Sequence, residues 1–356
     1  MLLVDDGSVP LDERVWASWL PVGDHGDDLA VSASWRRLVV ATDRGERVLG
    51  LRRHRYVAVR GRDLRAATDV ALEVVSGVRL AATVTALDDD GATVRVTTSA
   101  GQLRTGLVLD SVGVLGGVPP SPRAWMSFSG CEIETDGPAF DRTSVRLMDF
   151  RVPQADGATF AYTLPWTADR ALVELTRISA DPTPTSTDRD LTAHLDRVLG
   201  AGRYRVVRRE AGVLPLAPRV RRPRTTRCLA IGAEAGLVRS STGYGYARMR
   251  RDAACIAEQL RRGERPSGLR RSRRHHVMDA IFLELATRDA GTLVYSLERL
   301  FARNPVDLVL RFLDEATLPG EEARLISSLP TSPFLAAAVA AGGRLARGRP
   351  DRCQGR

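Results

Sequence analysis

The sequence has no long apolar run and few cysteine, histidine or aromatic residues. No stretch approaches the roughly 20 apolar residues of a membrane-spanning helix, and the apolar run 334–343 is too short. The chain starts apolar and turns acidic, so we expect no secretion signal. The five histidines have no metal-binding spacing, and we expect no metal. Four widely spaced cysteines without a C-x-x-C pair argue against disulfides and favour a reducing cytoplasm: Cys131, Cys228, Cys255 and Cys353.

Positive charge is what the chain has in excess, with a formal net charge of +9. Much of it lies in two arginine-rich runs, 219–227 and 261–276. Such runs can face an anionic membrane or nucleic acid, or can simply decorate solvated loops. Neither run is interleaved with aromatic residues, so we expect no nucleic acid partner. His275 and His276 lie in the second run, where we expect a solvated loop.

The first six residues, Met1 to Asp6, are typical of a short buried strand that ends in an acid. In a Rossmann-type unit, the second strand ends in an acid that binds ribose hydroxyls, about 20 residues after a G-x-G-x-x-G loop. That loop would lie before Met1, so we interpret the chain as lacking the first strand and glycine loop of such a fold. An ordinary edge strand is the alternative. The missing loop has two possible explanations: a start codon placed too late, or a degenerate gene copy.

Further along, strands and helices interleave, which predicts an α/β fold that ends in a helical region. The pattern 125–178 alternates as an antiparallel sheet does. The other expected elements are hairpins at 38–42/46–51 and 84–87/93–98, strands at 56–62, 107–110 and 228–232, helices at 63–76 and up to about 262, and helices from 278 onward.

Four segments carry most of the functional information. The first, Cys228 to Tyr244, is a strand that leads into a glycine-rich turn, where backbone N–H groups can approach an anion. The other three are Gly130–Asp136 continuing to Arg151, Phe160–Pro165 followed by Ala171–Thr176, and Leu313–Glu315 with Leu325–Phe334; shorter segments of the same kind are Arg14–Trp19, Tyr56–Gly61 and Glu210–Leu216.

Together and in this order, these segments resemble the bacterial FAD-dependent lycopene β-cyclases. The resemblance implies a Rossmann-type FAD-binding flavoprotein fold without its first strand and glycine loop, with an inserted antiparallel substrate sheet and a helical C-terminal region. We therefore expect an FAD-binding domain at 1–124 and 205–265, the substrate sheet at 125–204, the helical region at 266–345, and a disordered basic tail at 346–356.

The resemblance also implies a reaction, in which lycopene end groups are closed to β-ionone rings by acid-initiated, non-redox cyclisation. Reduced FAD would stabilise the carbocation, and NADPH would keep the flavin reduced. The expected substrate is lycopene or a related carotenoid, reached by peripheral association with the cytoplasmic membrane. Two alternatives stay open: an FAD-dependent monooxygenase or oxidoreductase of an isoprenoid, and an inactive truncated homologue.

Cyclisation needs a carboxylic acid that stays protonated, which burial can achieve. Glu174 is the first candidate because it occupies the leading acid of the family's acidic motif. Glu132 and Glu134 are the alternatives, since on an alternating strand they share one face and both could point into the pocket. Leu175 stands where the family has a second acid, Ser240 stands where it usually has Pro, and the usual Arg is missing after Asp110. The expected cofactor contacts are Asp5, Asp110, Gly232, Gly236, Ser241, Thr242 and Gly243. Four aromatic residues are expected either in the substrate pocket or in the hydrophobic core: Phe160, Tyr162, Trp166 and Tyr244.

Overall fold

The computed structural model describes residues 1–8, 11–24, 30–116, 122–182, 187–217 and 222–347. Two pairs of short parallel strands form one end of the molecule. Strand β1 (Leu2–Val4) pairs with β7 (Val78–Leu80), and β11 (Val108–Asp110) pairs with β17 (Cys228–Ala230). Helix α1 (Gly61–Val74) precedes β7, and α3 (Tyr246–Arg261) follows β17. A strand forms at the start of the chain as predicted, and it lies parallel to its neighbour as in a Rossmann-type unit. The prediction that it is buried is wrong, because Leu2 is 46% exposed and the other two residues are only half-buried.

Two small antiparallel sheets accompany these pairs. One contains β8 (Val84–Asp89), β9 (Val94–Thr98) and β10 (Gly101–Thr105), and it includes the hairpin predicted from the Asp-rich turn. The other contains β2 (Val15–Pro21), β3 (Ala33–Trp35) and β6 (His54–Arg60), after a short 3-10 turn at Leu11–Glu13.

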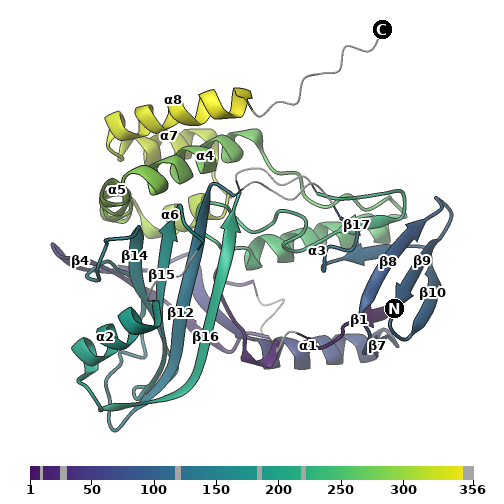
Figure 1. Cartoon of the computed structure of the whole chain (residues 1–356), viewed down its shortest axis with the longest axis horizontal. Helices are drawn as coiled ribbons and strands as arrows, with labels where there is room; N and C mark the ends of the chain where they lie inside the picture. The colour runs from purple at the N-terminus through teal and green to yellow at the C-terminus, as the bar shows by residue number, and fades with distance from the viewer. Residues whose placement is uncertain (9–10, 25–29, 117–121, 183–186, 218–221, 348–356) are drawn as a thin grey trace.

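A seven-stranded sheet dominates the other half of the molecule (Figure 1). Its order is β16 (Tyr204–Leu216), β12 (Ala124–Thr135), β15 (Arg170–Ser179), β14 (Ala158–Pro165), β13 (Val145–Asp149), β4 (Arg37–Thr42) and β5 (Gly45–Gly50). All neighbours are antiparallel except β13 and β4. The sheet is wider than the predicted segment 125–204, because β16 and the hairpin β4–β5 hydrogen-bond to its two sides. The division of the chain into domains stays a prediction.

Helices cover both faces of this sheet. Helix α2 (Thr187–Leu199) packs on β12 and β15 from one side, around a small core that includes Leu191 and Leu195. On the other side lie α4 (Arg273–Arg288) and α5 (Ala290–Arg303), followed by α6 (Val306–Leu313), α7 (Pro319–Ser327) and α8 (Thr331–Arg347). The sharp start of α5 has a local cause, since the Asp289 carboxylate accepts the backbone N–H of Thr292 at 2.8 Å. The predicted helical C-terminal region is confirmed.

The second arginine-rich run differs from the prediction of a solvated loop. His275 lies inside α4 and is buried, with its Nε2 atom 3.1 Å from a carboxylate oxygen of Glu322. Arg271 and Arg274 of the same run pair with buried acids. A buried charge is costly unless it is paired. These basic residues are therefore buried because acids from distant parts of the chain pair with them.

In the described part of the chain, no helix combines the length and apolar character needed to cross a bilayer. The residues described also contain no cluster of three or more His, Cys, Asp or Glu side chains suited to a metal ion. Most of the predicted basic tail, residues 348–356, and part of the first arginine-rich run, residues 219–221, lie outside the described residues.

Candidate active site

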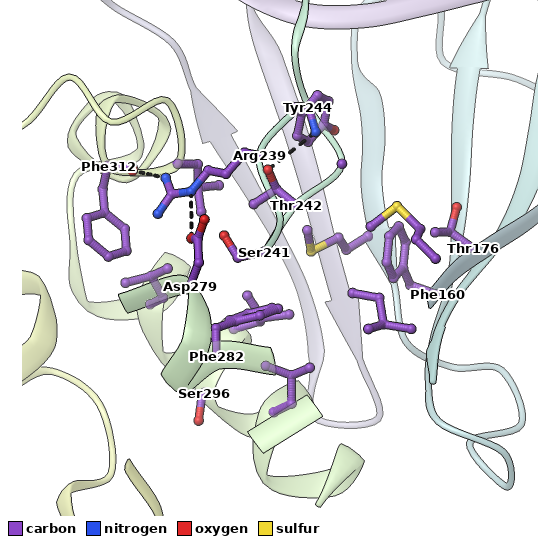
Figure 2. Close-up of a pocket in the computed structure, with 18 of the residues that line it drawn as sticks. Phe160, Thr176, Arg239, Ser241, Thr242, Tyr244, Asp279, Phe282, Ser296 and Phe312 are labelled. Carbon is purple, nitrogen blue, oxygen red and sulfur yellow. Dashed lines mark hydrogen bonds and ion pairs between the residues drawn. The ribbon is translucent and has the colours of Figure 1, made fainter. Parts of the chain in front are cut away.

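A cavity of about 1050 Å³ lies between the seven-stranded sheet, the loop 239–245 and the C-terminal helices. Figure 2 shows this loop facing α4 on one side and the sheet residues Phe160 and Thr176 on the other. Most of the wall is apolar, with aromatic and aliphatic side chains from β14, β15, α4, α5 and α8. The space matches the size of known small-molecule sites, which are apolar and carry a few convergent polar groups.

Glu174 is one of those few polar groups, and its place follows from the alternation of β15. Leu172, Glu174, Thr176 and Ile178 all line the cavity, whereas Leu175 belongs to the core on the opposite face. Burial in this apolar wall raises the pKa of Glu174 to about 7, although the Thr176 hydroxyl, which donates to Oε1 at 2.5 Å, acts in the opposite direction. The structure therefore brings the first candidate acid to the cavity in a form that holds its proton near neutral pH.

A second carboxyl group, Glu210, lines the same cavity; it begins the family-like segment Glu210–Leu216, but the sequence indicated no role for it. It lies on β16, and burial raises its pKa while a 2.8 Å hydrogen bond from Arg208 opposes that rise. Gly130 on β12 is the register partner of Glu174 on one side and of Glu210 on the other. The signal that could have found Glu210 is the alternation of β16, which also brings Leu214 to the cavity.

The two alternative acids occupy other environments. Glu132 is buried and accepts hydrogen bonds from Arg60 at 2.9 Å and Arg170 at 2.8 Å. Burial disfavours its charge, but these two guanidinium groups, with that of Arg208 at 3.5 Å, outweigh burial and hold the pKa of Glu132 below its ordinary value. Glu134 pairs with Arg205 at the partly exposed end of β12. Neither side chain lines the cavity, so the expectation that both could point into the pocket is corrected.

Three of the four predicted pocket aromatics line the cavity: Phe160, Tyr162 and Tyr244. The hydroxyl groups of Tyr162 and Tyr244 both hydrogen-bond to Tyr56, at 2.8 and 2.9 Å, so a fully buried tyrosine from β6 ties the sheet to the loop 239–245. Trp166 is the exception, because it lies outside the cavity wall and stacks with Arg60, whose guanidinium carbon is 4.0 Å from the ring centroid.

The glycine-rich segment after β17 turns as predicted, with positive φ at Gly232, Gly236 and Gly243. A side chain at Gly232 would meet nothing within 4 Å, so the space above this turn is open. The backbone N–H groups of Gly232, Ala233 and Glu234 have no hydrogen-bond partner within the described ranges. Consecutive free N–H groups in such a turn form a site suited to an anion.

The remaining predicted cofactor contacts are split between two places. Ser241, Thr242 and Gly243 line the cavity, and Asp110 lies beside the Gly232 turn, where its backbone carbonyl accepts the N–H of Ile231 at 2.8 Å. The Asp110 carboxylate is already used, since it accepts three backbone N–H groups of the loop that follows β11. Asp5 follows β1, a strand of the other parallel pair, and lies 3.5 Å from Arg79.

An ion-pair cluster holds the loop 239–245 against the C-terminal helices. The Arg239 Nε atom donates to Asp279 on α4 at 3.2 Å, and its guanidinium also binds the Phe312 carbonyl (Figure 2). Arg271 binds the same Asp279, which is fully buried. Burial disfavours the charge of Asp279, but Arg239 and Arg271 keep its pKa below the ordinary value. No sequence motif indicated this cluster, which fixes one wall of the cavity.

Comparisons with known proteins agree with this arrangement. The family model described as lycopene cyclase protein matches residues 1–339. A lycopene β-cyclase from Paracoccus sp. is 27% identical over 94% of this chain and 88% of its own length. Among solved structures, a flavoprotein/dehydrogenase from Cytophaga hutchinsonii covers 97% of this chain and 93% of its own, with 14% identity and a TM-score of 0.63. A geranylgeranyl bacteriochlorophyll reductase-like protein from Thermoplasma acidophilum covers 97% and 91%, with 13% identity and a TM-score of 0.57. The similarity to these structures confirms the Rossmann-type flavoprotein fold.

Proposed function

The chain belongs to the lycopene cyclase family, and from that premise we propose that it is a lycopene β-cyclase. It would convert the linear end groups of lycopene to β-ionone rings, with no net oxidation and with reduced FAD as cofactor. The observation that carries this proposal is Glu174, a carboxyl group whose pKa is raised to about 7 in the wall of a large apolar cavity.

Glu174 would start the reaction by protonating the terminal C=C bond of the end group. Such a step needs an acid that is still protonated at the working pH, and a pKa near that pH suits general acid catalysis, which contributes ~10²–10⁴-fold. Thr176 holds the Oε1 atom of this carboxyl by a hydrogen bond, which leaves the other oxygen available to the cavity. The role of Thr176 is therefore to orient the acid.

The cavity wall would exclude water from the cation that forms. Leu164, Leu172, Phe282 and Leu297 are among the apolar side chains that line it, and water excluded from the site cannot add to the cation. The faces of Phe160, Tyr162 and Tyr244 offer cation–π attraction at the same wall. Tyr56 would hold two of these rings in place through their hydroxyl groups.

The residues present fit an FAD molecule. The free backbone N–H groups at Gly232, Ala233 and Glu234 suit a pyrophosphate, and the open space above Gly232 leaves room for it. Ser241, Thr242 and Gly243 connect this turn to the cavity and would contact the flavin ring. When bound and reduced, the flavin supplies negative potential close to the developing cation. NADPH would serve to keep the flavin reduced.

Conversion of lycopene under anaerobic conditions, with prereduced FAD, tests this function. We expect cyclic product without stoichiometric consumption of NADPH, and no ring formation by a Glu174→Gln variant. An oxidised product formed with one NADPH per turnover would instead identify a monooxygenase or oxidoreductase. A folded chain that stays colourless with added FAD and leaves lycopene unchanged would identify an inactive homologue.

Peripheral association with a membrane belongs to the same proposal, because lycopene is buried in lipid. Leu335 on α8 lines the cavity and is 61% exposed; exposed Ile326 lines the same cavity, and exposed Val339 lies about one turn beyond Leu335 on α8. These apolar residues would form the mouth through which the substrate enters, while basic residues face anionic head groups. Sedimentation with vesicles that contain anionic lipid should retain the protein at low salt and release it at high salt. Vesicle binding that depends neither on salt concentration nor on anionic lipid would contradict the proposed contact between basic residues and head groups.

A further inference from the structure

Besides the acid, ring closure requires a base that removes a proton from the cyclised cation, and no motif of the sequence identified one. We propose that Glu210 is this base and that it works as a pair with Glu174. This assignment rests on the proposed cyclase function and adds a second catalytic residue to it.

The position of Gly130 is the first support for the pair. Strand β12 lies between β15 and β16, and Gly130 is aligned with Glu174 on one side and Glu210 on the other. A Cβ atom at Gly130 would lie 3.2 Å from Cγ of Glu210 and 3.5 Å from Cγ of Glu174. Because glycine leaves that space free, the two glutamate side chains approach each other across it, and both line the cavity.

The surroundings of the two carboxyl groups give them different roles. Burial raises the pKa of Glu210, but the Arg208 guanidinium, which donates to it at 2.8 Å, opposes that rise and stabilises the carboxylate that a base needs. The hydrogen-bonding partner of Glu174 is the neutral hydroxyl of Thr176, and the negative charge of Glu210 favours its protonated form. Two neighbouring carboxyl groups whose environments differ in this way are a common arrangement for an acid and a base.

The pair also explains a departure from the family pattern. Leu175 occupies the position of the family's second acid, but its side chain lies in the core on the opposite face of the sheet, away from the cavity. Leucine at this position therefore takes no carboxylate away from the reaction. The second carboxyl group of the cavity comes instead from β16, 36 residues further along the chain than Glu174.

Glu174 and Glu210 together account for every proton that the reaction adds and removes. Glu174 gives its proton to the terminal alkene carbon, and the π electrons of a second C=C bond form the new C–C bond of the ring. Glu210 then takes a proton from the ring carbon next to the cation, and the electrons of that C–H bond become the ring double bond. The proton passes from Glu210 to Glu174 across Gly130, which restores both residues without any oxidant or reductant.

Product analysis of a Glu210→Gln variant tests the assignment. The variant keeps its acid, so it should still protonate lycopene, but the cation must lose a different proton or capture water. We expect at least a tenfold drop in β-rings and a shift toward rings with the double bond elsewhere or with a hydroxyl group. A Glu46→Gln variant is the matched control, because Glu46 is also paired with arginine on the same sheet but lies outside the cavity. It should match the wild type in rate and product.

A second variant covers the case in which Glu210→Gln makes no product. In Glu210→Ala with an unchanged unfolding midpoint, added formate should restore β-rings by acting as a small carboxylate base. Exclusive β-ring formation at the wild-type rate by Glu210→Gln, or a folded Glu210→Ala variant that formate does not rescue, would overturn the assignment while the cyclase function stands. A wild-type protein that leaves lycopene linear would refute the proposed function and this assignment with it.

Discussion

Replacement of Glu174 by glutamine should change both activity and stability, and the stability change has a sign that the structure sets. The pKa of this carboxyl is raised from 4.5 to about 7 by burial in the cavity wall. One pKa unit corresponds to about 1.4 kcal/mol, so the raised value corresponds to about 3 kcal/mol of unfolding free energy.

Between pH 4.5 and pH 7, the native protein keeps the proton on Glu174, whereas the unfolded chain has released it. Stability falls with rising pH wherever the native state binds more protons than the unfolded state. Glu174 therefore costs the wild type little near pH 4 and about 3 kcal/mol at pH 8 and above. Glutamine has no proton to lose and avoids this cost.

Denaturant unfolding of both proteins at pH 4 and pH 8 measures the effect. The difference in unfolding free energy, variant minus wild type, should increase by about 3 kcal/mol between these two pH values, since titrating groups remote from Glu174 contribute equally to both proteins. In parallel, the cyclisation rate of the wild type should decrease about tenfold per pH unit above pH 7, because the acid is then ionised. A stability difference that does not vary with pH would show that the pKa of Glu174 is not raised in the folded protein.

Three further substitutions test the neighbourhood of the acid. Gly130→Ala adds a Cβ 3.2 Å from Cγ of Glu210, so we expect a loss of ~1–3 kcal/mol in denaturant unfolding together with slower cyclisation; an unchanged rate would argue against the close approach of the two acids. Tyr56→Phe removes the hydroxyl that joins two tyrosines of the cavity, so it should cost ~1–3 kcal/mol in the same measurement and leave the cavity tyrosines less ordered. An unchanged unfolding free energy would mean that water replaces the Tyr56 hydroxyl. Asp279→Asn leaves the buried Arg239 and the partly buried Arg271 without their shared carboxylate and should cost ~3–5 kcal/mol near pH 7. Because the pKa of Asp279 is lowered, this contribution is present above the unfolded pKa and disappears as the pH falls, so an equal loss at pH 3 and pH 7 would contradict it.

Much of the fold could be predicted because local patterns dominate it. The Asp-rich turn between β8 and β9 and the alternation of β14 and β15 are properties of neighbouring residues, and the structure has them where they were expected. The glycine-rich turn at Gly232 was predictable for the same reason, since positive φ angles favour glycine. The width of the large sheet was not predictable, because β4 and β16 join it from positions far away in the sequence.

Two segments of the candidate site follow from local sequence: the strand that carries Glu174, with its alternating faces, and the glycine turn that follows β17. The partners of each charged group depend instead on how distant segments pack together in the folded chain. This packing surrounds Glu132 with arginines, buries His275 between acids, and places Glu210 opposite Glu174 across Gly130. The physical reason is that a period of two residues tells which side chains share a face, whereas the pKa of a carboxyl depends on groups within a few ångströms that come from distant parts of the chain.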